Sequence, residues 1–155
     1  AFGGRRPMQT LRYGPAERRA TYEALNSNGT STDVDYVMLG CPHAALEQIE
    51  EVARLLDGKR ISAKSNLWIF TSRIIKAQAD AKGLTRTILD AGALVMTDTC
   101  SAIGQTMPKG TKVVALDSAK QSHYLPAIMG IEAWFGTTQD CIDAALTGRW
   151  TGALS

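Results

Sequence analysis

Three cysteines are the residues of this 155-residue sequence whose type and spacing best suit chemistry. They are Cys41, Cys100 and Cys141, and His43 lies two residues after the first of them. An odd number of widely spaced cysteines argues against a disulfide framework, and without a C-x-x-C pair a zinc ribbon is a poor interpretation. Three thiolates can hold an iron–sulfur cluster with one iron open to substrate, or zinc with His43 as a fourth ligand. The remaining interpretation is three small buried side chains and no cofactor.

Short apolar runs alternate with helical patterns from residue 34 onward and predict the elements that position these cysteines. Nearly continuous apolar runs, each followed by a helix, indicate a parallel sheet covered on both faces. We therefore expect an α/β fold with a parallel sheet of about five strands and helices on both faces. The expected strands are Val34–Leu39, Leu67–Phe70, Ala93–Met96, Lys112–Leu116 and Ile131–Phe135. The expected helices are 15–25, 46–56, 74–81, 85–91 and 139–146, with another beginning near Lys120.

The predicted topology gathers the cysteines at one edge of the sheet. Right-handed crossovers place the carboxyl ends of all parallel strands on the same edge, where open α/β sheets bind their ligands. Cys41 and Cys100 directly follow two of the strands, and Cys141 lies in the first turn of the last helix. Helix N-termini stabilise thiolate, the form that binds metal. The pattern therefore allows all three cysteines to converge on one point.

Hydroxyl side chains stand at the starts of several predicted helices on this edge. Such residues commonly serve only as helix caps. The functional interpretation is that several helix N-termini form a site for a carboxylate or phosphate. Lys120 favours that interpretation, because a cation at a helix N-terminus is unfavourable unless a bound anion relieves it. The hydroxyl residues are Thr71, Ser72, Ser118, Thr137 and Thr138.

Composition excludes several other classes of protein. The net charge is +2, and the pairs Arg5-Arg6 and Arg18-Arg19 are isolated, so we expect no nucleic-acid partner. No apolar run approaches the roughly 20 residues that cross a bilayer, and the first residues do not resemble a signal peptide. We therefore expect a cytoplasmic protein without a membrane partner. No G-x-G-x-x-G or G-x-x-x-x-G-K-[ST] motif supports nucleotide binding.

Four motifs resemble, in order, consecutive motifs of the aconitase X family. They span about residues 33–150, nearly the whole chain. The motifs are Leu39-Gly40-Cys41-Pro42-His43, Thr97-Asp98-Thr99-Cys100, Asp117-Ser118-Ala119-Lys120-Gln121-Ser122-His123-Tyr124 and Phe135-Gly136-Thr137-Thr138-Gln139-Asp140-Cys141-Ile142.

This resemblance implies a hydro-lyase that eliminates water from a small hydroxy acid at an iron–sulfur centre. The family holds that centre with three cysteines, which here would be Cys41, Cys100 and Cys141. The family substrates are cis-3-hydroxy-L-proline and mevalonate 5-phosphate, and we favour the first because no clamp rich in Arg or Lys is evident. By the same resemblance Ser118 and Lys120 would be catalytic, and His43, Thr71, Ser72, Thr137 and Thr138 would contact the substrate.

The expected organisation is a helix with a polar link over residues 1–33 and an α/β domain over residues 34–150. The resemblance implies an enzyme several hundred residues long, whose other domains also line the active site. We therefore expect this chain to be a fragment, a domain or a subunit that is inactive alone. Its expected partners are the remaining domains or a small subunit. The competing class is a metal- or ligand-binding module without activity.

Overall fold

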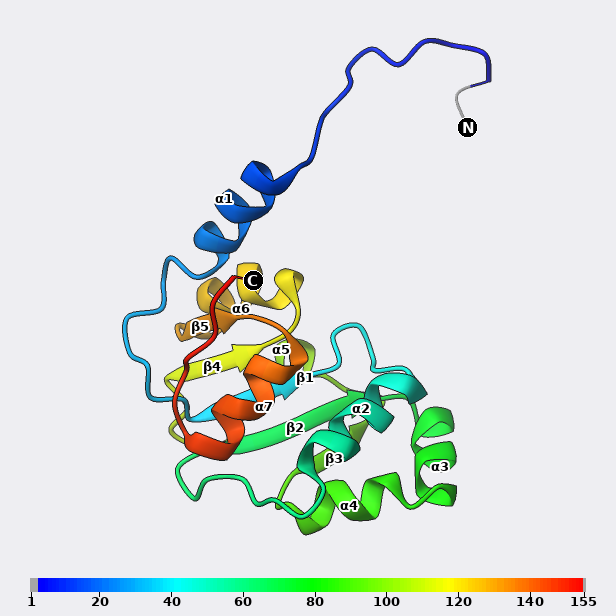
Figure 1. Ribbon diagram of the computed structural model, residues 1–155, viewed down its shortest axis with the longest axis vertical. Helices are drawn as coiled ribbons and strands as arrows, with labels where there is room; N and C mark the ends of the chain where they lie inside the picture. The colour runs from blue at the N-terminus through cyan, green and yellow to red at the C-terminus, as the bar shows by residue number, and fades with distance from the viewer. Residues whose placement is uncertain (1–2, 155) are drawn as a thin grey trace.

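A five-stranded parallel sheet forms the centre of the computed structural model, which describes residues 3–154 (Figure 1). The strand order is β3-β2-β1-β4-β5, and every neighbouring pair is parallel. The predicted fold class is therefore confirmed. The strands are β1 (Tyr36–Leu39), β2 (Asn66–Thr71), β3 (Leu94–Thr97), β4 (Val113–Leu116) and β5 (Glu132–Phe135).

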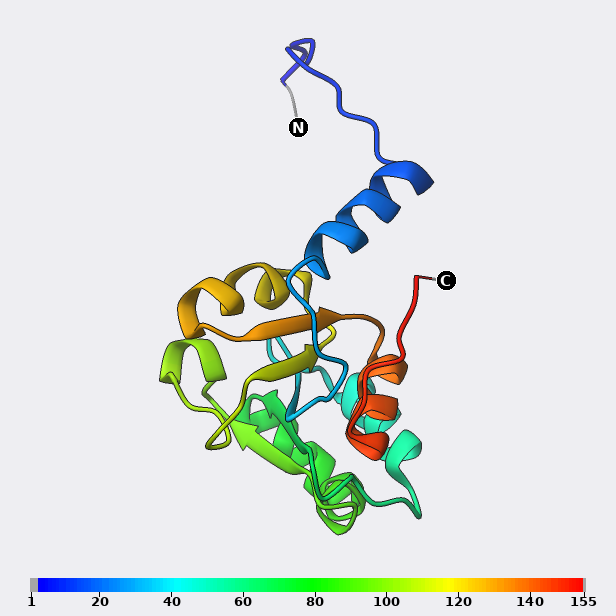
Figure 2. The same ribbon diagram turned by 90° about the vertical axis from the view of Figure 1, so that its left-hand side faces the viewer.

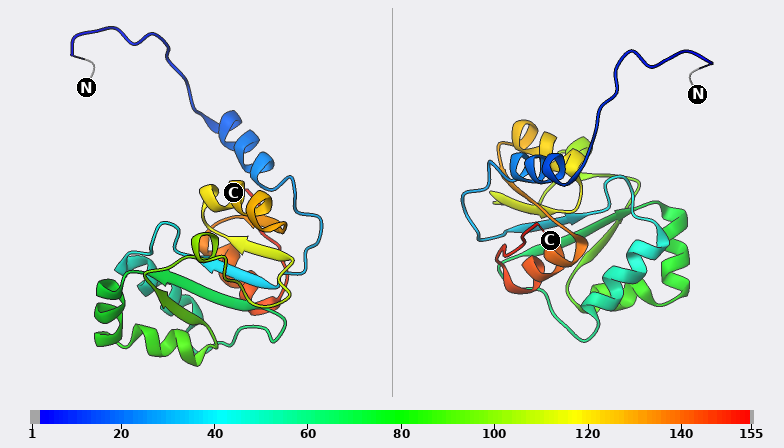
Figure 3. Two further views of the ribbon diagram at one scale, coloured as in Figure 1. Left: turned by 180° about the vertical axis from the view of Figure 1, so that it is seen from behind. Right: turned by 45° about the horizontal axis from the view of Figure 1, so that its top comes forward.

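Helices cover both faces of this sheet (Figures 1 and 3). Helices α2, α3, α4 and α7 lie on one face, α5 and α6 lie on the other, and α1 rests against β5 and α6. Residues 3–14 run away from the rest of the domain (Figure 2). The helices are α1 (Pro15–Leu25), α2 (Leu46–Leu56), α3 (Arg73–Ala81), α4 (Leu84–Asp90), α5 (Ser101–Gly104), α6 (Ala119–Met129) and α7 (Thr138–Thr147).

Alternate residues of β1 face the two halves of the core. Val37 and Leu39 belong to the apolar cluster under α2 and α7, whereas Tyr36 and Met38 belong to the cluster under α6. All four side chains are buried. Because a strand at the centre of a covered sheet buries both faces, it appears in the sequence as an unbroken apolar run.

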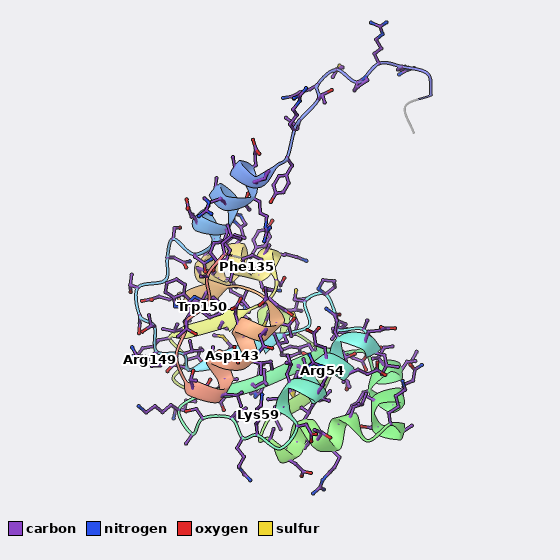
Figure 4. The ribbon with its side chains drawn as sticks, viewed as in Figure 1. Arg54, Lys59, Phe135, Asp143, Arg149 and Trp150 are labelled. Atoms are coloured by element: carbon purple, nitrogen blue, oxygen red, sulfur yellow. The ribbon has the colours of Figure 1, made fainter. Side chains whose placement is uncertain are left out.

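The observed boundaries differ slightly from the predicted ones. Strand β1 begins at Tyr36 rather than Val34, because the Val34 amide donates to the Gly148 carbonyl (2.9 Å) and so pairs with the C-terminal segment instead. That segment then runs beside α7, where Trp150 (Figure 4) stacks on Trp134 with ring centroids 5.9 Å apart. The short helix α5 was not predicted, since four residues carry no helical periodicity.

Strands β1 and β4 are neighbours, although β2 and β3 lie between them in the sequence. The chain leaves these two strands toward opposite faces, so a crevice opens beyond their carboxyl ends. Such a switch point is where open α/β sheets bind ligands.

Within residues 3–154, no helix is both long and apolar enough to span a membrane.

Candidate functional site

A pocket of about 550 Å³ opens beyond the carboxyl ends of the strands, between the loops after β1 and β3, the start of α5 and one side of α6. Four of the predicted site residues line it: Cys41, His43, Cys100 and Lys120. The structure thus brings together two of the three predicted metal ligands, one predicted substrate contact and one predicted catalytic residue. The other lining residues are Gly40, Pro42, Ala102, Ile103, Gln121, Tyr124 and Ile128.

The loop that carries Cys41 is fastened to strand β2. The Ala44 amide donates to the Phe70 carbonyl (2.8 Å), and the buried Thr71 hydroxyl donates to the Ala44 carbonyl (2.7 Å). Gly40 begins the loop at φ +87°, in the left-handed region that favours glycine. Cys41 itself is half-buried, and its sulfur accepts a hydrogen bond from Nε2 of Gln121 (3.0 Å).

Cys100 is placed by the start of α5. Its sulfur accepts a hydrogen bond from the Ile103 amide (3.3 Å), so the thiol caps this short helix. Nε2 of His43 lies 3.0 Å from the Thr99 carbonyl and so joins the two cysteine-bearing loops. Next to Thr99, hydrogen bonds from Arg73 hold the pKa of the Asp98 carboxyl below its ordinary value. The two pocket cysteines therefore sit on loops that are tied to each other.

Cys141 lies elsewhere in the core. It is fully buried in α7 among residues of the cluster under α2 and α7, whereas Cys41 and Cys100 pack against the cluster on the other face. Burial raises the pKa of its thiol well above the ordinary value, and the nearby Asp117 and Asp140 carboxylates raise it further. Among residues 3–154, no three or more His, Cys, Asp or Glu side chains are arranged to hold a metal ion. The three cysteines thus do not meet at one point in this structure.

The predicted hydroxyl residues serve mainly as helix caps. Oγ of Ser72, Ser118 and Thr137 accepts hydrogen bonds from amides in the first turns of α3, α6 and α7, at 3.2, 3.4 and 3.1 Å respectively. The Thr138 hydroxyl donates to Asp117 (3.1 Å). In the described part of the chain, neither these four residues nor Thr71 lines the pocket. The capping interpretation therefore accounts for Ser72, Ser118 and Thr137, and an anion site shared by these helix starts stays a prediction.

The sequence did not predict several residues that line the pocket. Gln121 is 5% exposed and reaches across from α6 to Cys41. Tyr124 is 51% exposed, and with Ile103 and Ile128 it makes an apolar rim. The spacing of Gln121, Tyr124 and Ile128 on one helix face was the signal that could have revealed this wall.

A second hollow of about 330 Å³ lies between α1, the end of β5 and the C-terminal segment. Its lining includes Thr137, Tyr22 and Asp140. Tyr22 has a raised pKa, mainly through burial, with the Asp140 carboxylate contributing. Thr137 is thus placed with this hollow, apart from the cysteine pocket.

Fold and site together define an open α/β domain that presents two thiols at its topological switch point. Residues 34–147 match the sequence model described as the aconitase X third domain. The chain therefore belongs to the aconitase X family.

Curated relatives match nearly the whole chain but extend well beyond it. The chain is 37% identical to cis-3-hydroxy-L-proline dehydratase of Pseudomonas aeruginosa, over 99% of this chain and 27% of that protein. It is 36% identical to the phosphomevalonate dehydratase large subunit of Methanocaldococcus jannaschii, over 87% of this chain and 32% of that protein. It thus spans about a quarter to a third of the length of these relatives.

The fold is also similar to a solved structure. The crystal structure of Thermococcus kodakaraensis aconitase X, in its holo-form, superimposes with a TM-score of 0.69 at 29% identity. The match covers 84% of this chain and 33% of that one. The parallel sheet and its helices are therefore those of an aconitase X domain.

Proposed function

We propose that this chain is the thiol-bearing domain of an aconitase X hydro-lyase, which removes water from a small hydroxy acid. The observation that carries the proposal is the pocket at the switch point, where Cys41, Cys100, His43 and Lys120 come together. The dehydratases named among the relatives support the reaction class. A purely structural role would not explain why two thiols, an imidazole and an ammonium group line the same pocket.

The cofactor we propose is an iron–sulfur group held by Cys41 and Cys100. Both are half-buried free thiols that line one pocket, and thiolate is the ligand that iron–sulfur groups use. Cys141 does not fit as readily, because its buried side chain does not line the pocket; its role as third ligand stays a prediction of the family resemblance. Once bound, the group would supply Lewis acidity toward the leaving hydroxyl. Zinc held by the three cysteines and His43 meets the same difficulty at Cys141.

Lys120 is the residue we propose to bind the substrate carboxylate. It is exposed at the start of α6, so its ammonium can form a charge-assisted hydrogen bond with an anion in the pocket. His43 would contact the substrate from the opposite loop, held in place through the Thr99 carbonyl. Ser118 would act indirectly, by capping the helix that presents Lys120.

The remaining part of the polypeptide, or a small subunit, is the partner we propose to cover this pocket. Ile103, Tyr124 and Ile128 are 90%, 51% and 52% exposed, an unusual grouping of apolar side chains at a pocket rim. Covering them would also exclude water from the reacting groups. One relative named as a large subunit supports an assembly of more than one part.

We further propose that the chain divides into an N-terminal segment, residues 1–33, and an α/β domain, residues 34–150. We also propose a cytoplasmic location, because three free thiols favour a reducing compartment.

The substrate we favour is cis-3-hydroxy-L-proline, as in the Pseudomonas aeruginosa relative. Among the described residues that line the pocket, Lys120 is the one lysine or arginine. A phosphate group with about two negative charges would be expected to recruit more cationic side chains. Mevalonate 5-phosphate is the second candidate, because two of the relatives are named as large subunits of phosphomevalonate dehydratase.

The test is anaerobic reconstitution with iron and sulfide, followed by a dehydration assay with the partner parts supplied. The proposal predicts iron bound with charge-transfer absorption, and loss of water from cis-3-hydroxy-L-proline in preference to mevalonate 5-phosphate. Iron-free, colourless protein in the complete assembly, with neither substrate dehydrated, would refute it. Dehydration of the phosphate ester alone would move the assignment to the second candidate.

A further inference from the structure

Gln121 stands out in the pocket because it is buried without being satisfied. Its side chain is 5% exposed, in the first turn of α6. Nε2 donates to the Cys41 sulfur (3.0 Å), whereas Oε1 is buried and has no hydrogen-bond partner within residues 3–154. Within the described residues, the hydrogen bond that the Gln121 side chain makes is therefore to a thiol.

Stability alone does not explain this residue. A buried amide oxygen without a partner is destabilising, whereas an apolar side chain of the same shape is close to neutral or stabilising. The neighbouring positions Ser122 and Leu125 show that α6 buries its face against the core in this region. A methionine would fill the same space as Gln121 without an unpaired polar atom. What glutamine adds is the N–H group directed at Cys41.

The orientation of the amide matches a metal-binding thiolate. A thiolate sulfur accepts hydrogen bonds and donates none, so the amide must present its N–H to the sulfur and turn its oxygen away. That arrangement is the one observed, with Nε2 on Cys41 and Oε1 unpaired. The contact also crosses the switch point, since Gln121 follows β4 and Cys41 follows β1.

We propose that Gln121 is a positioning residue for Cys41, whose N–H···S hydrogen bond fixes the sulfur for a thiophilic metal centre. The proposal rests on the proposed function only in taking Cys41 as a metal ligand. Hydrogen-bonding partners of metal ligands typically contribute 10- to 100-fold to metal affinity. Gln121 would therefore be retained for metal binding at some cost in stability.

The experiment is a cadmium titration of the 155-residue chain, which reports thiolate–cadmium absorption without iron, sulfide or substrate. The variants are Gln121→Met and Gln121→Leu, which remove the donor. Gln78→Met on the exposed surface of α3 is the matched control, and Cys100→Ser tests that the pocket thiols bind the metal. Thermal unfolding of each metal-free variant is measured in parallel.

We expect Gln121→Met to weaken cadmium binding by about 10-fold or more, with a melting temperature equal to or above that of the unsubstituted chain. Gln78→Met should leave the cadmium affinity unchanged. Unchanged cadmium affinity in both Gln121→Met and Gln121→Leu would overturn the proposal, as would an unsubstituted chain that binds no cadmium. A large fall in melting temperature would also overturn it, because Gln121 would then be structural. Weakened cadmium binding without dehydratase activity in the full assembly would instead refute the proposed function alone.

Discussion

Replacing Gly40 by alanine should displace the loop that carries Cys41. Gly40 is buried at the end of β1 with φ +87°. A Cβ at this position would overlap the main-chain carbonyl oxygen of Phe70. That carbonyl already accepts the Ala44 amide (2.8 Å), and a strand carbonyl cannot rotate aside as a side chain would. The substitution therefore forces β1 and β2 apart where the pocket begins.

The expected cost has two parts. A non-glycine residue in left-handed conformation costs about 1–2 kcal/mol, and overpacking a close contact adds about 1–3 kcal/mol. The Gly40→Ala variant should thus lose about 2–5 kcal/mol of unfolding free energy. Gly58 is the matched control, because its φ is +66° and nothing lies within 4 Å of an added Cβ. Gly58→Ala should lose only the conformational part, about 1–2 kcal/mol.

Urea denaturation followed by circular dichroism measures both variants on the same chain. The reasoning predicts that Gly40→Ala unfolds at clearly lower urea concentration than Gly58→Ala, and that only Gly40→Ala also weakens metal binding. Equal urea midpoints for the two variants would refute this reasoning, because the contact between an added Cβ at position 40 and the Phe70 carbonyl would then not lower the unfolding free energy.

Three further predictions concern side chains whose roles the structure defines. Thr71→Val leaves the buried Ala44 carbonyl without its hydroxyl donor and should lose about 1–3 kcal/mol in urea denaturation; a neutral result would mean that the bond does not hold the loop. Burial raises the pKa of the Cys141 thiol, so the unfolded chain ionises first and stability falls as pH rises beyond the ordinary thiol value. Cys141→Ala should therefore flatten the decline in melting temperature above about pH 9, and an unchanged slope would contradict the cause given. Lys120→Ala should weaken binding of a carboxylate substrate analogue in the full assembly while altering the unfolding free energy by at most about 0.5 kcal/mol; unchanged affinity would make Lys120 a surface residue.

The sequence predicts the elements of this fold well because burial on both faces leaves a local signature. Strand β4, buried at all four positions, lies within the predicted run Lys112–Leu116, and α2 occupies the predicted residues 46–56. The strand order is not a local property. It depends on which way each crossover turns, so the pairing of β1 with β4 could not be predicted from either strand alone.

The site is less predictable, because proximity to a sheet edge does not fix where a side chain points. Cys41 and Cys100 were expected at the rim and do line its pocket. Cys141 was expected there too, but in α7 it shares the buried face of Ile142 and Ala145. The contact of Gln121 with Cys41 joins residues 80 positions apart, and no local pattern encodes it.

The central claim is that Cys41 and Cys100 form the metal-binding pocket of a dehydratase domain. Its most direct test is the iron content of the anaerobically reconstituted protein, with Cys41→Ser and Cys100→Ser compared against the surface variant Gln78→Met. The account predicts that iron and its charge-transfer absorption are lost in both cysteine variants and retained in the control. Iron retained in full by both cysteine variants would contradict it.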